Sequence, residues 1–116
     1  MIIPVPLSKR RFLERGFNQA EVLAELLAKE TALKIDKQSL ARKVHTPVHR
    51  AAMDRRAREL TVENAFEVTR PKLVKGEKIL LVDDVFTSGA TTSTCAKALK
   101  KKGADKVYVL TIARAV

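Results

Sequence analysis

The sequence has 116 residues and a formal charge of +10, from 23 Lys and Arg against 13 Asp and Glu. This length fits a single domain over residues 1–116, and a content of 46% hydrophobic and 31% charged residues predicts a folded core. Its uncharged runs are far shorter than the about 20 residues of a membrane span, and no leader pattern precedes them. We therefore expect a soluble, cytoplasmic protein.

Cys95 is the single cysteine, which excludes an internal disulfide and a zinc site built on several thiolates. The positive charge favours anionic partners such as phosphorylated metabolites, nucleic acid or an anionic membrane surface. Aromatic residues form 4% of the chain, too few for the stacking platforms of dedicated single-strand binders. Nucleic-acid binding is therefore the less favoured interpretation of the charge.

The first part of the chain predicts a short strand and a helix. Residues 2–7 are rich in β-branched side chains, which favour a strand, but the two prolines have no backbone N–H to donate to a neighbouring strand. We therefore expect a short strand that runs into a loop. The spacing of apolar residues predicts a helix over 19–31. Its apolar face would consist of Val22, Leu23, Leu26 and Leu27. Asn18 is positioned to cap this helix, with Glu21 as the reciprocal carboxylate.

A basic stretch follows. Residues 34–43 give no clear pattern, and residues 42–58 carry six Lys and Arg against one Asp. We expect a flexible loop at about 42–62 that faces an anion, although a merely solvated loop fits the spacing equally well. His45 and His49 are more simply interpreted as solvated side chains than as acid–base groups. After the basic stretch, alternation of apolar and polar residues predicts a strand over 63–68, and the composition of 71–76 predicts a turn.

The most informative region begins with the apolar run at 79–82, which is typical of a buried parallel strand and ends in Asp83 and Asp84. Neighbouring strand residues point to opposite faces, so the two carboxylates should diverge, with at least one overlooking the crevice where α/β sheets bind ligands. A helix over 93–102 should stop at Gly103, before a strand over 107–112. Together these elements predict a βαβ unit.

The loop between Asp84 and this helix has the composition of a phosphate cradle. Gly89 permits close backbone approach, the hydroxyls of Thr87, Ser88, Thr91 and Thr92 can donate to anionic oxygens, and the helix start adds amides and a positive dipole end. The Walker and dinucleotide glycine patterns are absent from the sequence. A loop that merely caps a helix is the alternative, but the adjacent acidic pair favours a phosphorylated sugar.

The run ILLVDDVFTSGAT at 79–91 resembles the phosphoribosyl pyrophosphate motif of type I phosphoribosyltransferases. PVPLS at 4–8, RGFNQAE at 15–21 and TIAR at 111–114 are similar to ComF proteins, the competence-associated subgroup of that superfamily. The resemblance implies an α/β fold with a mostly parallel sheet and helices on its faces. The subgroup commonly carries a Cys-rich zinc-binding segment, for which this sequence has no cysteines besides Cys95.

The resemblance also implies roles for individual residues. Asp83 and Asp84 would be catalytic, accepting hydrogen bonds from the ribose hydroxyls and holding Mg²⁺ directly or through water. The 5-phosphate would be held by Thr87, Ser88, Gly89, Ala90 and Thr91. Pyrophosphate would be bound by Leu7, Ser8 and Lys9. The basic stretch would be the flexible loop that closes over the reaction centre, with Arg58 as its catalytic arginine.

Two functions follow as hypotheses. In the first, the protein binds phosphoribosyl pyrophosphate with Mg²⁺ and transfers the phosphoribosyl group to an acceptor that the sequence does not identify. In the second, it is a competence-associated module that binds single-stranded DNA, keeps the pocket for regulation and contacts competence machinery. The DNA contacts would come from Arg10, Arg11, Arg55, Arg56 and residues 100–102. Self-association is compatible with both, and Cys95 is expected to be a buried, inert thiol.

Overall fold

Three parallel strands form the centre of the structure, in the order β1 (Ile2–Pro4), β4 (Lys78–Phe86) and β5 (Lys106–Arg114). This computed structural model describes residues 1–7, 13–14, 16–43, 65–86 and 89–114. A parallel bridge between Ile35 and Ile2 continues the sheet beyond the outer edge of β1. The polar end of β4 therefore lies on the central strand, as expected of an α/β ligand site.

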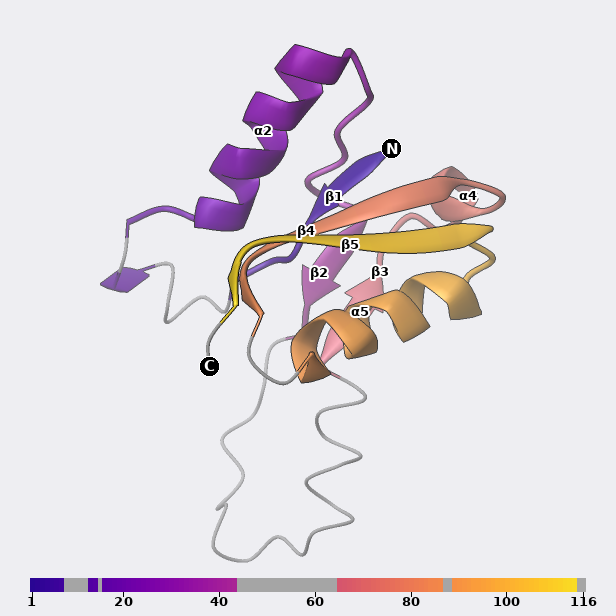
Figure 1. Ribbon diagram of the computed structural model, residues 1–116. Helices are drawn as coiled ribbons and strands as arrows, with labels where there is room; N and C mark the ends of the chain where they lie inside the picture. Colours follow the sequence, from indigo (N-terminus) through magenta and orange to yellow (C-terminus); the bar gives the residue numbers. More distant parts are fainter. Residues whose placement is uncertain (8–12, 15, 44–64, 87–88, 115–116) are drawn as a thin grey trace, which may run out of the picture.

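Both faces of this sheet carry other elements (Figure 1). Helix α2 (Gln19–Thr31) lies on one face, where Ala24 packs with Ile2 and Val82. The other face carries α5 (Ala90–Lys101) and the antiparallel pair of β2 (Leu40–Arg42) and β3 (Phe66–Val68). The predicted α/β class and the βαβ unit of β4, α5 and β5 are confirmed.

Helix α2 has the predicted bounds, and Asn18 is its cap, accepting a hydrogen bond of 3.0 Å from the amide of Ala20. The predicted buried face is wrong in part, because Val22 and Leu26 are exposed. Ala20 and Ala24 are the buried residues, since their small side chains let the helix backbone approach the sheet closely. Leu23 and Leu27 are half-buried beside them.

Several predicted boundaries also move. Residues 71–76, predicted as a turn, contain the short helix α4 (Pro71–Val74), which fits proline at a first helical position. Of the predicted strand over 63–68, residues 66–68 form β3. The predicted stop at Gly103 is confirmed, because this residue follows α5 with a φ of 98°. No helix within the described segments is long and apolar enough to cross a bilayer.

Candidate functional site

Asp83 and Asp84 lie within strand β4, which continues to Phe86, whereas the sequence predicts them at the carboxyl end of the strand. Asp83 is in register with Thr111 of β5, and the pairing continues to Phe86 opposite Arg114. Aspartate disfavours strands, but pairing with a neighbouring strand overrides such preferences. The acidic pair is therefore held on a backbone with ladder hydrogen bonds, which makes its position more rigid than a loop position would be.

Burial dominates the electrostatics of Asp83. The pKa of its carboxyl is raised to about 6, chiefly by loss of solvent and also by the side-chain hydrogen bonding and charge of Asp84. The amide of Asp84 acts in the opposite direction, because it donates a hydrogen bond of 2.9 Å to Oδ1 of Asp83. The prediction that the two carboxylates diverge is thus wrong: they interact. Their mutual repulsion and burial make the pair a strong attractor for a cation or hydroxyl donors.

Arg42 is a site residue that the sequence analysis did not identify. Its charge lowers the pKa of Asp83, and its Nε donates a hydrogen bond of 3.4 Å to the carbonyl oxygen of Pro6. The guanidinium also lies 4.6 Å from the ring centroid of Phe66. Arg42 belongs to β2 rather than to the predicted basic loop, because its strand pairs with β3. No local signal reveals that pairing, which spans residues far apart in sequence.

The phosphate-cradle prediction falls partly on described residues. Gly89 has a φ of 78° and is the N-cap of α5, which begins at Ala90 rather than at Ser93. Thr91 is therefore in the first helical turn and is exposed, whereas the buried Thr92 donates its hydroxyl to the carbonyl of Gly89 at 3.2 Å. Glycine has no side chain with which to cap the helix, in contrast to Asn18 on α2. The first amides of α5 are thus suited to bind an anionic ligand.

The chain after β1 starts beside the acidic strand. The amide of Val5 donates to the carbonyl of Val82 at 2.8 Å, and Nδ2 of Asn18 donates to the carbonyl of Val5 at 3.1 Å. Leu7, the first residue of the predicted pyrophosphate loop, is half-buried. The structure therefore places the described residues of the predicted site at or just after the carboxyl ends of β1 and β4; they are Leu7, Asp83, Asp84, Gly89, Ala90 and Thr91.

Other predicted residues lie outside the described part of the chain. They are Ser8, Lys9, Arg10, Arg11, His45, His49, Arg55, Arg56, Arg58, Thr87 and Ser88. Cys95 is described and is fully buried, and burial raises the pKa of its thiol to about 12. This agrees with the predicted inert thiol.

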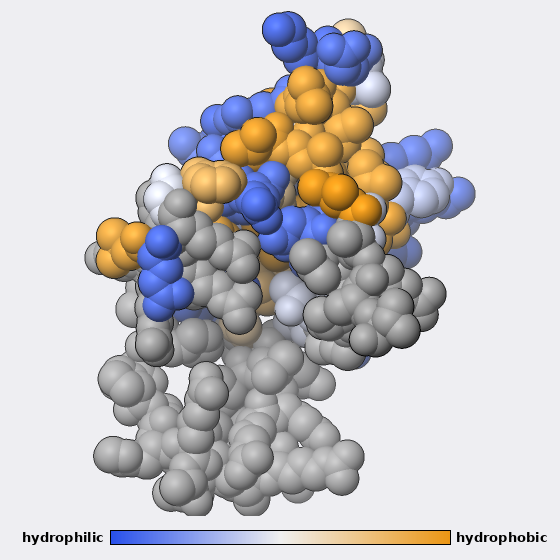
Figure 2. All heavy atoms as spheres, turned by 60° about the vertical axis from the view of Figure 1, so that its left-hand side comes forward, coloured by the Kyte–Doolittle hydropathy of each residue, from blue (hydrophilic) through white to orange (hydrophobic). Residues whose placement is uncertain are grey.

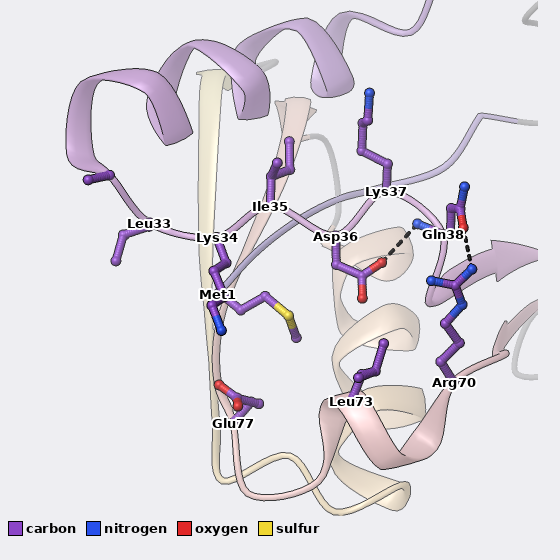
Figure 3. Close-up of a pocket in the computed structure, with 11 residues that line it drawn as sticks. Met1, Leu33, Lys34, Ile35, Asp36, Lys37, Gln38, Arg70, Leu73 and Glu77 are labelled. Atoms are coloured by element: carbon purple, nitrogen blue, oxygen red, sulfur yellow. Dashed lines mark hydrogen bonds between the residues drawn. The ribbon is translucent and has the colours of Figure 1, made fainter.

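A cavity of about 740 Å³ lies at the opposite end of the sheet (Figure 3). It lies between the segment after α2, helix α4 and the starts of β1 and β4. Two of its polar lining residues bond to each other, because Arg70 donates to the side chain of Gln38, and a third, Asp36, accepts from the hydroxyl of the neighbouring Ser39. These bonds fix the turn after α2, so we interpret the cavity as structural.

Comparison with known proteins places this geometry in a family. A model of the phosphoribosyl transferase domain matches residues 13–115. The chain belongs to the phosphoribosyltransferase family. This confirms the predicted resemblance to phosphoribosyltransferases.

Within this family, the chain is similar to two proteins named for competence and to one named for DNA utilization. It is 36% identical over 117 residues to competence protein F of Haemophilus influenzae, covering 98% of this chain and 50% of that protein. It is 35% identical over 103 residues to competence protein ComFC of Bacillus subtilis, covering 89% and 39%. Identity to the DNA utilization protein YhgH of Salmonella typhi is 35% over 113 residues, covering 97% and 48%. The chain thus spans about half the length of these relatives.

A solved structure supports the fold. The allosteric regulatory enzyme of purine biosynthesis aligns with a TM-score of 0.62 and 19% identity, covering 95% of this chain and 21% of that one. The parallel sheet with helices on both faces is therefore the phosphoribosyltransferase fold.

Proposed function

We propose that this protein binds phosphoribosyl pyrophosphate with Mg²⁺ and transfers the phosphoribosyl group to an acceptor, releasing pyrophosphate. The observation that carries the proposal is the position of Asp83 and Asp84 on the central strand, followed by the glycine-capped start of α5. Carboxylates suit the ribose hydroxyls, and a helix start suits the 5-phosphate. A sugar that carries phosphate matches both.

Each predicted residue has a part in this proposal. Asp83 and Asp84 accept hydrogen bonds from the ribose hydroxyls, and residues 87–91 hold the 5-phosphate. Residues 7–9 bind the pyrophosphate. Arg58, on the basic stretch, contributes positive charge over the reaction centre. Arg42 keeps Asp83 more acidic than burial alone would leave it.

The acidic pair also fits Mg²⁺. This ion is typically held by one or two carboxylates together with waters and substrate phosphates, which are the donors that Asp83, Asp84 and the substrate supply. When bound, Mg²⁺ would neutralise charge on the pyrophosphate. The residues of the chain would orient the ribose, fix the 5-phosphate and exclude water.

The reaction itself needs no covalent intermediate with the protein. The acceptor forms a bond to the anomeric carbon while the bond from that carbon to the pyrophosphate oxygen breaks. The electron pair leaves with pyrophosphate, and the acceptor loses its proton. Positive charge builds on the sugar ring in between, so stabilisation of the departing anion is the main contribution of the protein.

A thermal-shift titration tests the binding proposal. Phosphoribosyl pyrophosphate with Mg²⁺ at about 100 times its dissociation constant should stabilise the protein by roughly 2.7 kcal/mol. Ribose 5-phosphate and free pyrophosphate, each with and without Mg²⁺, serve as controls and should give smaller shifts. An equal response to all three compounds would reduce the site to a general anion site.

Single-stranded DNA binding is the second candidate function. It is favoured by the names of the relatives and by lysines that gather around the end of α5 and the starts of β4 and β5. Gly76 of the α4–β4 turn bonds to Gly103 at 2.8 Å, which brings these segments together. The exposed lysines there are Lys75, Lys78, Lys100, Lys101, Lys102 and Lys106.

The salt dependence of binding tests this second function. Affinity for a single strand should fall with salt at a log-log slope of about −0.7 for each phosphate neutralised. Glutamate at both Lys100 and Lys101 should flatten that slope. Glutamate at Lys29 and Lys34 changes the net charge equally and is the control. Glutamate at Arg55, Arg56 and Arg58 tests the basic stretch in the same way. A salt slope that changes with neither the two lysines of α5 nor these three arginines would exclude the DNA function.

A further inference from the structure

We propose that the amino end of the sheet, opposite the acidic pair, docks on an anionic membrane surface. The first observation is a pair of exposed leucines at this end. Leu33, in the turn after α2, is 48% exposed, and Leu73, on α4, is 50% exposed. Both line the cavity described above, although they come from different elements (Figure 3). A single surface laid against this end of the molecule can therefore contact both leucines.

Backbone hydrogen bonds hold the two leucines at the amino end. The carbonyl of Lys34 accepts from the amide of Ile2 at 2.7 Å, which attaches the turn after α2 to the start of β1. Helix α4 directly precedes β4, and the amide of Glu77 donates to the carbonyl of Val74 at 3.0 Å. Figure 1 shows α4 and the start of β4 at the same end of the sheet as the N-terminus. A surface at this end leaves the proposed sugar site, at the carboxyl end of β4, uncovered.

The second observation is the positive charge beside each leucine. Lys34 follows Leu33, Lys72 precedes Leu73, and all the cations next to the two leucines are exposed. Within the described segments Lys34, Lys72 and Lys75 form no ion pair, whereas the neighbouring Lys37 pairs with Glu21 and Glu25. We call this surface the basic–apolar rim; it consists of Leu33, Lys34, Arg70, Lys72, Leu73 and Lys75.

Acidic groups at this end do not cancel the charge of the rim. Asp36 is offset by Arg70, whose charge lowers the pKa of that carboxyl. Glu30, Glu77 and Asp105 are exposed near the rim. They are outnumbered by exposed lysines of the surrounding segments, namely Lys29, Lys78, Lys100, Lys101, Lys102 and Lys106. Figure 2 shows hydrophilic side chains at the top of the molecule, where α2 ends beside the rim.

The combination of leucines and lysines identifies the partner. Peripheral binding to a membrane uses apolar side chains that enter the headgroup region together with basic side chains that attract anionic lipids. A nucleic acid strand would use the lysines alone, because leucine offers no ring on which a base can stack. A second copy would bring the same positive charge, and the net charge of +10 opposes its approach. This inference does not depend on the proposed reaction.

Co-flotation with lipid vesicles tests the proposal on nuclease-treated protein. We expect the protein to float with vesicles of phosphatidylcholine and phosphatidylglycerol at a molar ratio of about 2:1, but not with phosphatidylcholine alone. Leu33→Asn combined with Leu73→Asn should lower the bound fraction about tenfold. Val22→Asn is the matched control, because Val22 is 55% exposed but lies in the first turn of α2, at the carboxyl end of β1.

Charge reversal tests the lysines of the rim. Lys34→Glu combined with Lys72→Glu should abolish flotation at low salt, whereas Lys43→Glu combined with Lys97→Glu changes the net charge equally and should weaken it less. Circular dichroism verifies that the variants fold. Failure of the protein to float with the anionic vesicles would overturn the proposal. Wild-type flotation of the double leucine variant would also overturn it, because the lysines would then form only a general polyanion surface.

A fluorescent reporter gives a test that does not depend on disruption. An environment-sensitive dye is attached to Leu33→Cys or, as the control, to Val22→Cys, and the native Cys95 does not react because it is buried. Anionic vesicles should shift the emission of the dye at residue 33 to shorter wavelength and leave the dye at residue 22 unchanged. Equal shifts at the two positions, or no shift at residue 33, would show that the rim does not face the lipid.

Discussion

Arg42 and Pro6 are joined by a hydrogen bond of 3.4 Å across 36 residues of sequence. This bond attaches the β2–β3 hairpin to the chain leaving β1, next to the acidic strand. The same guanidinium lowers the pKa of Asp83 and contacts the ring of Phe66. One side chain thus couples the position of the hairpin to the charge of the proposed sugar site.

Replacing Arg42 should change both properties. Arg42→Met removes a positive charge near Asp83, so the pKa of that carboxyl should rise and binding of phosphoribosyl pyrophosphate with Mg²⁺ should require a higher pH. Arg42→Lys keeps the charge but loses the Nε donor and the planar group. Its binding should follow the wild-type pH profile at reduced affinity. Calorimetric titrations from pH 5 to 8 distinguish the two, and identical profiles for Arg42→Met and wild type would remove Arg42 from the site.

Asp83→Asn should stabilise the protein while it abolishes ligand binding. Folded Asp83 releases its proton at about pH 6, whereas the unfolded carboxyl releases it near its ordinary value of 3.8. The folded state therefore binds more protons between these values, and the wild type loses stability as pH rises through them. The variant lacks this loss. We expect a gain of about 1–2 kcal/mol at pH 7, smaller than the full pKa shift implies because solvent screens a half-buried group.

Asp36→Asn is the matched control, with the opposite sign. Asp36 accepts hydrogen bonds from the amides of Gln38 and Ser39 at 3.0 and 2.9 Å, and its pKa is lowered by the Ser39 hydroxyl and these amides despite burial. The charged carboxylate of Asp36 therefore stabilises the fold above its ordinary pKa of 3.8, and this stabilisation is lost as the pH falls through the lowered pKa of the folded state. The variant should lose about 0.5–2 kcal/mol at pH 7. Denaturant melts at pH 4 and 7 measure the stability of both variants. A loss of stability in Asp83→Asn would show that the acidic pair has a structural role.

Much of the fold was predictable where local chemistry determines it. Asn18 and the apolar period fixed the bounds of α2, and Gly103 marked the end of α5. The motif at 79–91 located the acidic pair and Gly89. Features that depend on pairing between distant segments were not predictable: β4 continues past Asp83 because β5 lies beside it, and Arg42 reaches Pro6 because β2 pairs with β3.

The buried side of α2 shows a second limit. Hydrophobicity alone favours the leucines and Val22 as the buried set, whereas close packing favours the alanines. The acidic pair shows the same kind of limit. Strand alternation predicts that the carboxyls of Asp83 and Asp84 diverge, whereas in the structure Asp84 raises the pKa of Asp83 through its charge and its side-chain hydrogen bond.

Asn18 should matter for stability and for the ligand. Asn18→Ala removes the cap of α2 and the bond from Nδ2 to Val5, and it should destabilise the protein by about 1–2 kcal/mol. Asn18→Ser keeps the capping oxygen but loses the donor, so it isolates the bond to Val5, at about 0.5–1.5 kcal/mol. Both should weaken pyrophosphate binding, because Val5 precedes the loop proposed to hold it. Normal pyrophosphate affinity in Asn18→Ser would show that the bond from Asn18 to Val5 does not contribute to pyrophosphate binding.

Gly89→Ala separates backbone strain from ligand contact when it is compared with Gly76→Ala. The two glycines have φ angles of 78° and 77°, so alanine at either should destabilise the fold by about 1 kcal/mol. Gly76 lies before β4, at the end of the sheet remote from Asp83, and a Cβ there would meet no atom within 4 Å. We expect similar losses of stability in thermal melts. The response to phosphoribosyl pyrophosphate with Mg²⁺ should fall strongly in Gly89→Ala and remain in Gly76→Ala, because only the former places a methyl group where the 5-phosphate approaches the start of α5. Equal responses in the two variants would show that the helix start does not bind the phosphate.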